Sequence, residues 1–411
     1  MASIILKNIK SLFGVRKDSP LLRGEQLAAL PAIDDAFLIV EDGVIASYGP
    51  MQDLNYRDDG NSVDATGRFV LPCWCDSHTH LVFAASREEE FVDKIKGLTY
   101  ADIAARGGGI LNSAKKLAAA SEDELFNLAW SRLQEIAATG TGAVEIKSGY
   151  GLSVASELKM LRVIKKLKEK SALTIKATFL GAHAFPPEYK DNQNGYVDLI
   201  INEMLPVIAE EQLADYIDVF CEKGFFSNER TEKICLAGMA VGLKPKIHAN
   251  QLTSTGAVET GVRLNAVSVD HLETMDAGAI SALSGSATIG TLLPSAAFFL
   301  RMAYQPAREL ITAGAAIALA SDFNPGSSPS GNMNFVIALA CIQMKMLPEE
   351  AINAATLNGA HAMECGDRLG SITPGKTANL ILTRPISSLA YLPYSFGTNQ
   401  VERTMINGNW E

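Results

Sequence analysis

The apolar residues of this chain follow one pattern in its middle and another at its two ends. In the middle, short apolar runs typical of buried strands alternate with stretches whose apolar residues recur every three or four positions, as on a helix. The clearest helix follows Ser121, which forms a capping-box pattern with Glu124, and it ends before Gly140. The eight strand candidates end near His80, Tyr150, His183, Phe226, Gln251, Glu273, Ala296 and Pro325.

Eight strands that alternate with helices predict a (β/α)8 barrel of the TIM type, although a doubly wound open sheet fits the same pattern. The two ends of the chain carry hairpin signals instead. Asp42-Gly43 and Asn407-Gly408 each join two strand-like runs, and such pairs are typical of two-residue hairpin turns. The ends therefore form a different kind of structure from the middle.

Composition narrows the class of protein. Of the 411 residues, 47% are hydrophobic and 20% are charged, as in an ordinary globular enzyme. A formal net charge of −10 argues against a nucleic acid partner, and no apolar run is long enough to span a membrane or to serve as a signal peptide. Six cysteines in so long a chain do not make a disulfide scaffold, so we expect a cytoplasmic protein.

Polar residues gather where the predicted strands end. Asp76, His78 and His80 alternate along the first strand and so share one of its faces, with Asp76 a candidate to orient a ligand. His361, in a helical stretch, is expected to be structural. The other five of the six histidines and one aspartate follow strand ends, which converge on one face of a barrel: His78, His80, His183, His248, His271 and Asp322.

Histidines with an aspartate form a set of nitrogen and oxygen ligands that suits zinc or ferrous iron and disfavours calcium or magnesium. Such a metal with an open position supplies hydroxide near neutral pH and polarises a carbonyl, so the implied chemistry is hydrolysis. Cys73 and Cys75 point to the opposite strand face from the histidines, and no second cysteine pair completes a thiolate site. We expect buried, inert thiols there.

The strand-end motifs resemble those of a known family. "DSHTH", "KIHANQ", "VDHLE" and "ALASDFNPGS" are similar to motifs of the amidohydrolase superfamily. "HTHLVFAASREEEF", "EIKSGYGL", "FLGAHAFPPEY" and "SDFNPGSSP" resemble the imidazolonepropionase family of histidine degradation, and the resemblance runs over nearly the whole chain. It implies metal-dependent hydrolysis of the cyclic amide of 4-imidazolone-5-propanoate to N-formimidoyl-L-glutamate, by attack of metal-bound hydroxide on the ring carbonyl.

The resemblance also implies an architecture and a metal site. A small β-sandwich would be built from residues 1–68 and 371–411, and the barrel would occupy residues 69–370. Related barrels are often homodimers, so we expect a homodimer. One zinc or iron ion per subunit would be bound by four residues: His78, His80, His248 and Asp322.

A small ring with a carboxylate tail needs an anchoring cation. Arg87 follows the first strand and can bind a carboxylate bidentately, although a surface arginine paired with Glu88–Glu90 is the alternative. The glycines at 107–109 fit either a lid hinge or a helix C-terminus. The resemblance, together with the position of each residue, gives these substrate contacts: Arg87, Tyr150, His183, Gln251, Asn324, Gly326 and Ser327.

Gln251 departs from many relatives, which carry a glutamate there as a candidate general base. An amide does not take a proton, so Gln251 can only orient substrate or water. Our hypothesis makes Asp322 the base and His271 the group that polarises the carbonyl or steadies the oxyanion. Two rival interpretations are a ring deaminase, against which Gln251 counts, and a barrel that has lost its metal, against which the intact histidines and aspartate count.

Overall fold

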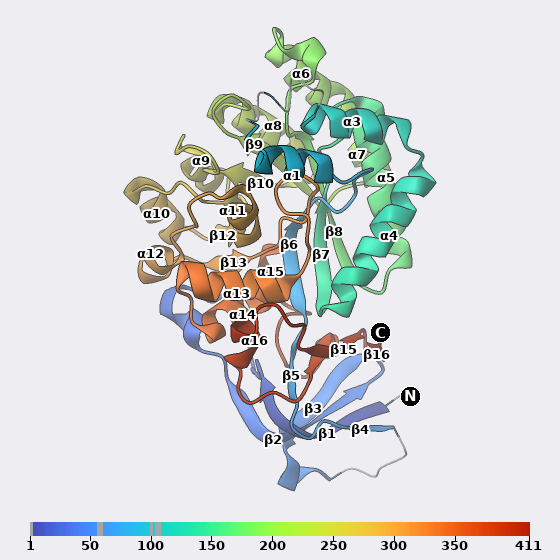
Figure 1. Cartoon of the computed structure of the whole chain (residues 1–411), viewed down its shortest axis with the longest axis vertical. Helices are drawn as coiled ribbons and strands as arrows, with labels where there is room; N and C mark the ends of the chain where they lie inside the picture. Colours follow the sequence, from blue (N-terminus) through green and yellow to red (C-terminus); the bar gives the residue numbers. More distant parts are fainter. Residues whose placement is uncertain (1–2, 56–60, 99–101, 103–107) are drawn as a thin grey trace.

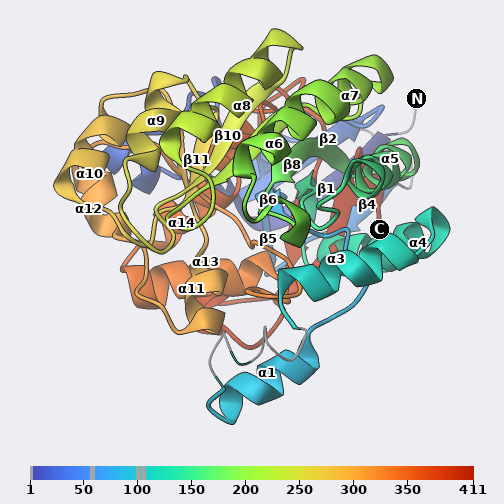
Figure 2. The same ribbon diagram turned by 90° about the horizontal axis from the view of Figure 1, so that it is seen from above.

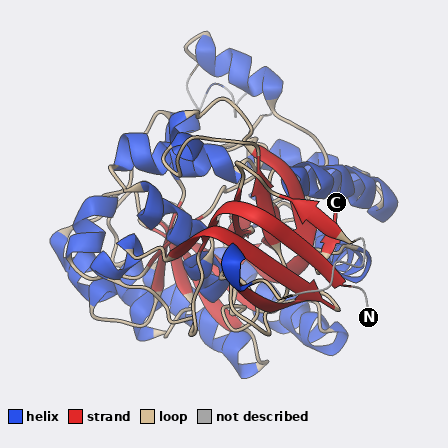
Figure 3. Cartoon of the chain, turned by 90° about the horizontal axis from the view of Figure 1, so that it is seen from below, coloured by secondary structure: helices blue, strands red, loops and turns tan. Residues whose placement is uncertain are grey.

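The protein consists of an eight-stranded parallel barrel and a second sheet that both ends of the chain build below it (Figures 1 and 3). The structure is a computed structural model, and it describes residues 3–55, 61–98, 102 and 108–411. Helices surround the barrel, whereas the second sheet lies at the opposite end from α1 and α6 (Figure 1). The predicted fold class is confirmed, and the doubly wound alternative is excluded because the sheet closes.

The barrel strands follow one another in chain order, and every neighbouring pair is parallel. A bridge between Thr79 and Phe323 closes the ring, with His80 N donating to the Phe323 carbonyl at 2.9 Å. The strands are β6 (Trp74–Thr79), β7 (Thr141–Lys147), β8 (Thr174–Ala182), β9 (Tyr216–Cys221), β10 (Lys244–Ala249), β11 (Ser268–His271), β12 (Ile289–Leu292) and β13 (Ile317–Leu319).

The helices between the strands cover the outside of the barrel (Figure 2). The capping box predicted at the start of α4 is present, since Glu124 N donates to Ser121 Oγ at 3.2 Å and Ser121 N donates back to Glu124 Oε2 at 2.8 Å. The helices are α1 (Glu88–Ile95), α3 (Ile110–Ala119), α4 (Glu122–Ala138), α5 (Val154–Lys170), α6 (Gln193–Leu199), α7 (Leu205–Glu211), α8 (Asn228–Ala240), α9 (Ala257–Arg263), α10 (Ala277–Ser284), α11 (Pro294–Leu300), α12 (Ala307–Thr312), α13 (Met333–Met344), α14 (Pro348–Ala355), α15 (Leu357–Ala362) and α16 (Tyr391–Tyr394), with a π-helical turn, η4 (Ile200–Met204), and 3-10 turns η1 (Gly24–Ala28), η2 (Met51–Asp53) and η3 (Pro187–Tyr189).

The second sheet joins strands from the two ends of the chain. Both predicted hairpins are present, and Asp42, Gly43, Asn407 and Gly408 all have the positive φ that two-residue turns of this kind require. The predicted barrel start at residue 69 falls on β5, which pairs with β1 and β14 in this sheet. The strands are β1 (Ser3–Phe13), β2 (Ala32–Glu41), β3 (Val44–Pro50), β4 (Ser62–Asp64), β5 (Phe69–Pro72), β14 (Leu380–Thr383), β15 (Val401–Ile406) and β16 (Asn409–Trp410).

Two further expectations concern single residues. Cys73 and Cys75 are buried, and burial raises the pKa of both thiols, as expected for inert cysteines. His361 contacts the Ser19 carbonyl at 2.8 Å through Nε2, which supports a structural role. Within the described residues, none of the helices has the length and apolar character needed to cross a membrane.

Candidate active site

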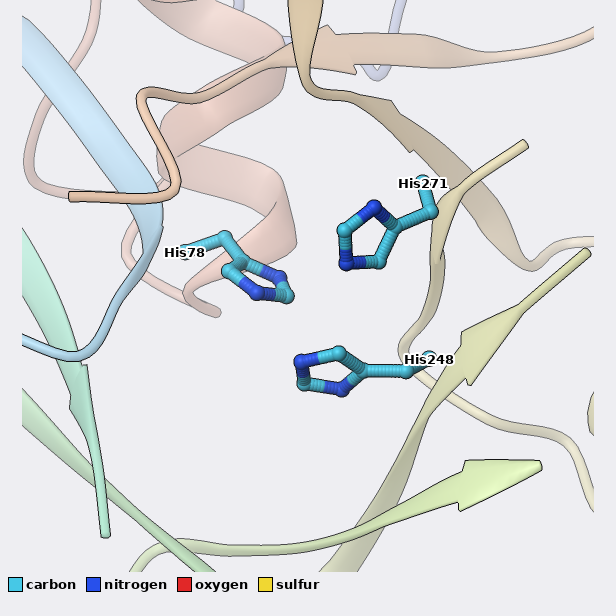
Figure 4. A group of neighbouring side chains, drawn as sticks. All are labelled: His78, His248 and His271. Atoms are coloured by element: carbon cyan, nitrogen blue, oxygen red, sulfur yellow. The ribbon is translucent and has the colours of Figure 1, made fainter. Parts of the chain in front are cut away.

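Four histidines and one aspartate meet at the carboxyl ends of the barrel strands. They come from β6, the residue after it, β10, β11 and the segment after β13, and none is more than 3% exposed: His78, His80, His248, His271 and Asp322. Two groups within this cluster have ligand atoms close enough to hold one ion. One comprises His78, His248 and His271, whose rings face one another in Figure 4, and the other comprises His78, His80 and Asp322.

The four ligands implied by the family resemblance face a common point. Asp322 Oδ1 lies 3.6 Å from Nε2 of both His78 and His80, and His80 Nε2 lies 3.4 Å from His248 Nε2. Burial lowers the pKa of His78 and His80 well below the ordinary histidine value, so both rings are neutral and offer lone pairs. His78 Nε2 is buried without a hydrogen-bond partner. This donor set fits a zinc or iron ion.

Two buried aspartates orient two of these histidines. Asp270 Oδ2 lies 2.7 Å from His78 Nδ1, and Asp218 Oδ2 lies 2.9 Å from His248 Nδ1. At His78 this hydrogen bond fixes the proton on Nδ1 and leaves Nε2 free to face the site. At His248 the side-chain contact is an ion-pair distance, and Asp218 Oδ1 also accepts from the backbone N–H of His248 at 3.1 Å. Asp76, a candidate for such an orienting role, instead binds the segment that follows the neighbouring strand β13. Its carboxylate accepts from Ser321 N at 3.0 Å and from Ser321 Oγ at 2.5 Å, directly before Asp322.

The two residues predicted to be catalytic, Asp322 as the base and His271 as the group that polarises the carbonyl or steadies the oxyanion, lie in contrasting surroundings. Burial raises the pKa of Asp322 above its ordinary value, and Ser327 Oγ donates to its carboxylate at 3.1 Å. Burial lowers the pKa of His271, but the charge and hydrogen bond of Glu273, whose Oε1 lies 3.4 Å from His271 Nδ1, outweigh it and raise that pKa. Gln305 Nε2 donates to the same Glu273 oxygen at 3.0 Å.

A cavity of about 490 Å³ adjoins the cluster. All seven residues predicted to contact a substrate line it: Arg87, Tyr150, His183, Gln251, Asn324, Gly326 and Ser327. His80 connects the two parts of the site, because its ring stacks on His183 with centroids 5.4 Å apart and lies 5.8 Å from the ring of Tyr150. The cavity and the histidine cluster are therefore one site.

The side chains in this cavity have defined hydrogen-bonding states. His183 Nδ1 lies 3.0 Å from the Gly149 carbonyl, so it carries the proton and leaves Nε2 as an acceptor. Burial and the nearby His248 lower the pKa of His183 to about 3, which keeps this ring neutral. Arg87 Nε donates to Ser113 Oγ at 2.9 Å, rather than pairing with the acidic residues that follow it, and its terminal nitrogens remain near the cavity.

Two glycines lie beside side chains of the cavity. Gly149 has a φ of +109°, and a Cβ there would lie 2.9 Å from His183 Nδ1. A Cβ at Gly326 would lie 2.7 Å from Arg87 Nη1, so a larger residue there would displace the end of the guanidinium. Of the predicted hinge glycines, Gly107 lies outside the described residues. Gly109 has a φ of 81° and precedes α3, so it starts a helix rather than ending one.

The sequence analysis missed the charged residues that support the site from below. Asp218 and Asp270 orient ligands, and Glu145, Lys147 and Lys246 lie beside them, all at most 1% exposed. The signal was present: in "AVEIKS", "YIDVFC", "KPKIHA" and "VSVDHL" the charged residues alternate with apolar ones along strands. Alternation places them on one strand face, and in a barrel that face points inward.

Comparison with known proteins gives three kinds of match. The amidohydrolase family profile matches residues 243–410. A curated imidazolonepropionase of Flavobacterium johnsoniae is 58% identical over 405 residues, 98% of each chain. Another, from Shewanella baltica, is 45% identical over 380 residues, 92% of each chain.

Solved structures show the same architecture at low sequence identity. A triazine hydrolase variant matches with a TM-score of 0.74 at 15% identity and covers 99% of this chain and 94% of its own. A guanine deaminase from C. acetobutylicum, with guanine bound, matches with a TM-score of 0.69 at 17% identity over 100% of both chains. These two likenesses establish the fold alone.

Proposed function

The chain belongs to the imidazolonepropionase family of amidohydrolases, and we propose that it hydrolyses the cyclic amide of 4-imidazolone-5-propanoate to N-formimidoyl-L-glutamate. The observation that carries this proposal is the continuity of the cavity with the histidine cluster. The cavity holds a guanidinium for a carboxylate tail, and the cluster beside it holds imidazoles and Asp322 for a metal and a proton. A small ring with an acidic tail fits this polarity.

Arg87 binds the propanoate tail in this proposal. Its Nε is held by Ser113, which fixes the plane of the guanidinium and leaves the terminal nitrogens to bind both carboxylate oxygens. Burial raises the pKa of Tyr150, so its phenol stays protonated and donates to the substrate. His183 Nε2 accepts from a ring N–H, and Gln251 and Asn324 align the ring by hydrogen bonds.

His78, His80, His248 and Asp322 would hold one zinc or iron ion. Such an ion, when bound, lowers the pKa of water and polarises a carbonyl oxygen. Asp322 takes the proton from the attacking water and delivers it to the ring nitrogen as the carbon–nitrogen bond breaks. His271, held at Nδ1 by Glu273, steadies the negative charge that develops on the carbonyl oxygen. The former ring carbonyl becomes a carboxylate, and the nitrogen leaves within the formimidoyl group.

The test is ring opening of freshly prepared 4-imidazolone-5-propanoate, followed by its ultraviolet absorbance. The protein is assayed as isolated, after chelation, and after addition of zinc or ferrous iron. Metal-dependent formation of N-formimidoyl-L-glutamate would support both substrate and chemistry, and the better restoring ion would identify the metal. Absence of turnover by metal-loaded protein, or release of ammonia from a ring amine, would refute the substrate assignment.

The homodimer and the cytoplasmic location expected from the sequence stay predictions. Analytical ultracentrifugation of the purified chain tests the first, and fractionation of cells that express it tests the second. A monomer at micromolar concentration would contradict the expected dimer without affecting the proposed chemistry.

A further inference from the structure

Five charged side chains fill the barrel directly below the candidate metal ligands. Barrel interiors are usually filled with branched apolar residues, because a buried charge is strongly unfavourable unless it is paired. Here two lysines and three acidic residues are at most 1% exposed: Glu145, Lys147, Asp218, Lys246 and Asp270. A charged layer at this depth needs a reason beyond stability, since apolar residues would fill the same space more favourably.

Lys147 connects the two aspartates that orient metal ligands. Its Nζ lies 2.6 Å from Glu145 Oε1, 2.8 Å from Asp218 Oδ2 and 3.5 Å from Asp270 Oδ2. The same Asp218 oxygen lies 2.9 Å from His248 Nδ1, and the same Asp270 oxygen lies 2.7 Å from His78 Nδ1. One ammonium group therefore touches the two oxygen atoms that face the two rings.

Lys246 lies in the same charged layer but does not join the two aspartates. Its Nζ pairs with Glu145 and donates to the Ser77 carbonyl at 3.3 Å. Among the described residues, Lys246 Nζ has one carboxylate within 4 Å, that of Glu145. The carboxylates of Asp218 and Asp270, in contrast, each have one lysine or arginine nitrogen within 4 Å among the described residues, and both times it is Lys147 Nζ. The two lysines are equally buried in the same barrel interior, so they form a natural matched pair.

We propose that Lys147 is a positioning residue for the metal site, which holds Asp218 and Asp270 in place and through them orients the rings of His248 and His78 together. The inference rests on the proposed metal site. Without the ammonium group, two buried carboxylates lose the cation that offsets their charge, and they turn away or are neutralised. Both imidazoles then lose the partner that keeps Nε2 directed at the metal.

The experiment measures zinc affinity of the full-length chain, stripped of metal, by competition with a chromophoric chelator. Lys147→Met should weaken zinc binding by about 10–100-fold, the usual effect of losing an orienting partner, and should change the visible spectrum of the Co²⁺-substituted protein. Lys246→Met should bind zinc close to wild type, although it also removes a buried charge. Lys147→Gln, which keeps a polar group on a side chain one atom shorter, replaces Lys147→Met if the latter does not fold.

A double-mutant cycle separates positioning from general damage. If Lys147 acts through Asp270, then adding Lys147→Met to Asp270→Asn should weaken zinc binding less than Lys147→Met does alone. Wild-type affinity in both Lys147 variants, an equal loss in Lys246→Met, or full additivity would overturn the inference. The measurement needs no substrate, so a wrong substrate assignment leaves it intact, whereas failure of the wild-type chain to bind either zinc or ferrous iron would overturn both proposals.

Discussion

Replacement of Glu157 by glutamine should weaken substrate binding, although Glu157 does not line the cavity. Glu157 is fully buried, and its carboxylate accepts backbone N–H groups from Gly149, Gly151 and Leu152 at 3.0, 2.6 and 3.0 Å. These bonds fix the loop that carries Tyr150 into the cavity. The amide removes the charge and turns an N–H group toward one backbone donor. Since a hydrogen bond to a charged group contributes about 1.5–3 kcal/mol, we expect a loss of about 2–4 kcal/mol in stability.

The loop should shift as a consequence, and Tyr150 should lose its hydrogen bond to the substrate. That loss corresponds to about 1.4 kcal/mol, roughly a tenfold rise in KM, with a smaller change in kcat. The assay is ring opening at pH 8, because burial raises the pKa of Glu157 and the argument concerns its ionised form.

Glu350→Gln is the matched control for this prediction. Glu350 is 2% exposed, accepts from Leu347 N at 2.7 Å and pairs with Arg308, but it lies on α14 rather than at the cavity. The control should lower the melting temperature by a similar few degrees and leave KM unchanged. A wild-type KM in Glu157→Gln despite lower stability, or an equal rise in KM in the control, would refute the reasoning.

Four further predictions concern the site and the thiols. Asp322→Asn should lower kcat by about 10²–10⁴-fold, the usual contribution of a general base, whereas Gln251→Ala should raise KM more than it lowers kcat; equal losses of turnover would disprove this division of roles. Arg87→Met should raise KM by about 10–100-fold through loss of a bidentate ion pair, and an unchanged KM would return Arg87 to the surface-residue interpretation. Chelation should lower the melting temperature, and added zinc should restore it, because a ligand that binds only the folded state stabilises it. Of the six cysteines, Cys341 is half-buried and the others are buried, so a thiol reagent should label at most one thiol before denaturation and six afterwards.

The barrel could be predicted well from the sequence, because most of its strands are short, largely apolar runs whose ends the sequence marks. The predicted ends near His80, His183 and Gln251 fall within two residues of those observed for β6, β8 and β10. The misplaced ends have local causes. The strand predicted to end near Ala296 ends at Leu292, although the residues that follow are also mostly apolar. Pro294 begins α11 there, and proline is favoured at the first position of a helix. Periodicity alone does not distinguish such a continuation from a longer strand.

The interior partners could not be predicted in the same way. Glu145 and Lys246 are 101 residues apart in the chain, and Lys147 and Asp218 are 71 apart. Each appears in the sequence as a charged residue that alternates with apolar ones, which is also the pattern of a strand with one face in water. Only closure of the barrel makes that face an interior. The candidate histidine ligands did not share this ambiguity, because histidines are scarce in the chain and stand at strand ends.

Two residues predicted to be catalytic have an unusual backbone conformation. Asp322 and His271 have φ values of 53° and 86°, in the left-handed region that non-glycine residues seldom adopt. At Asp322 the cause is visible, because its N–H donates to the His78 carbonyl at 3.0 Å while the next residue bridges to β6 and closes the barrel. The closure of the barrel between β6 and the segment after β13 thus imposes an unfavourable backbone conformation on Asp322, and this conformation directs its carboxylate inward. Such strain persists only where the surroundings over-determine it, and it gathers at functional sites. Asp322→Gly should abolish turnover, because the carboxylate is lost. It should destabilise the protein less than expected for the loss of a buried, hydrogen-bonded side chain, because glycine relieves the backbone strain at position 322. Thermal unfolding of the variant measures this difference.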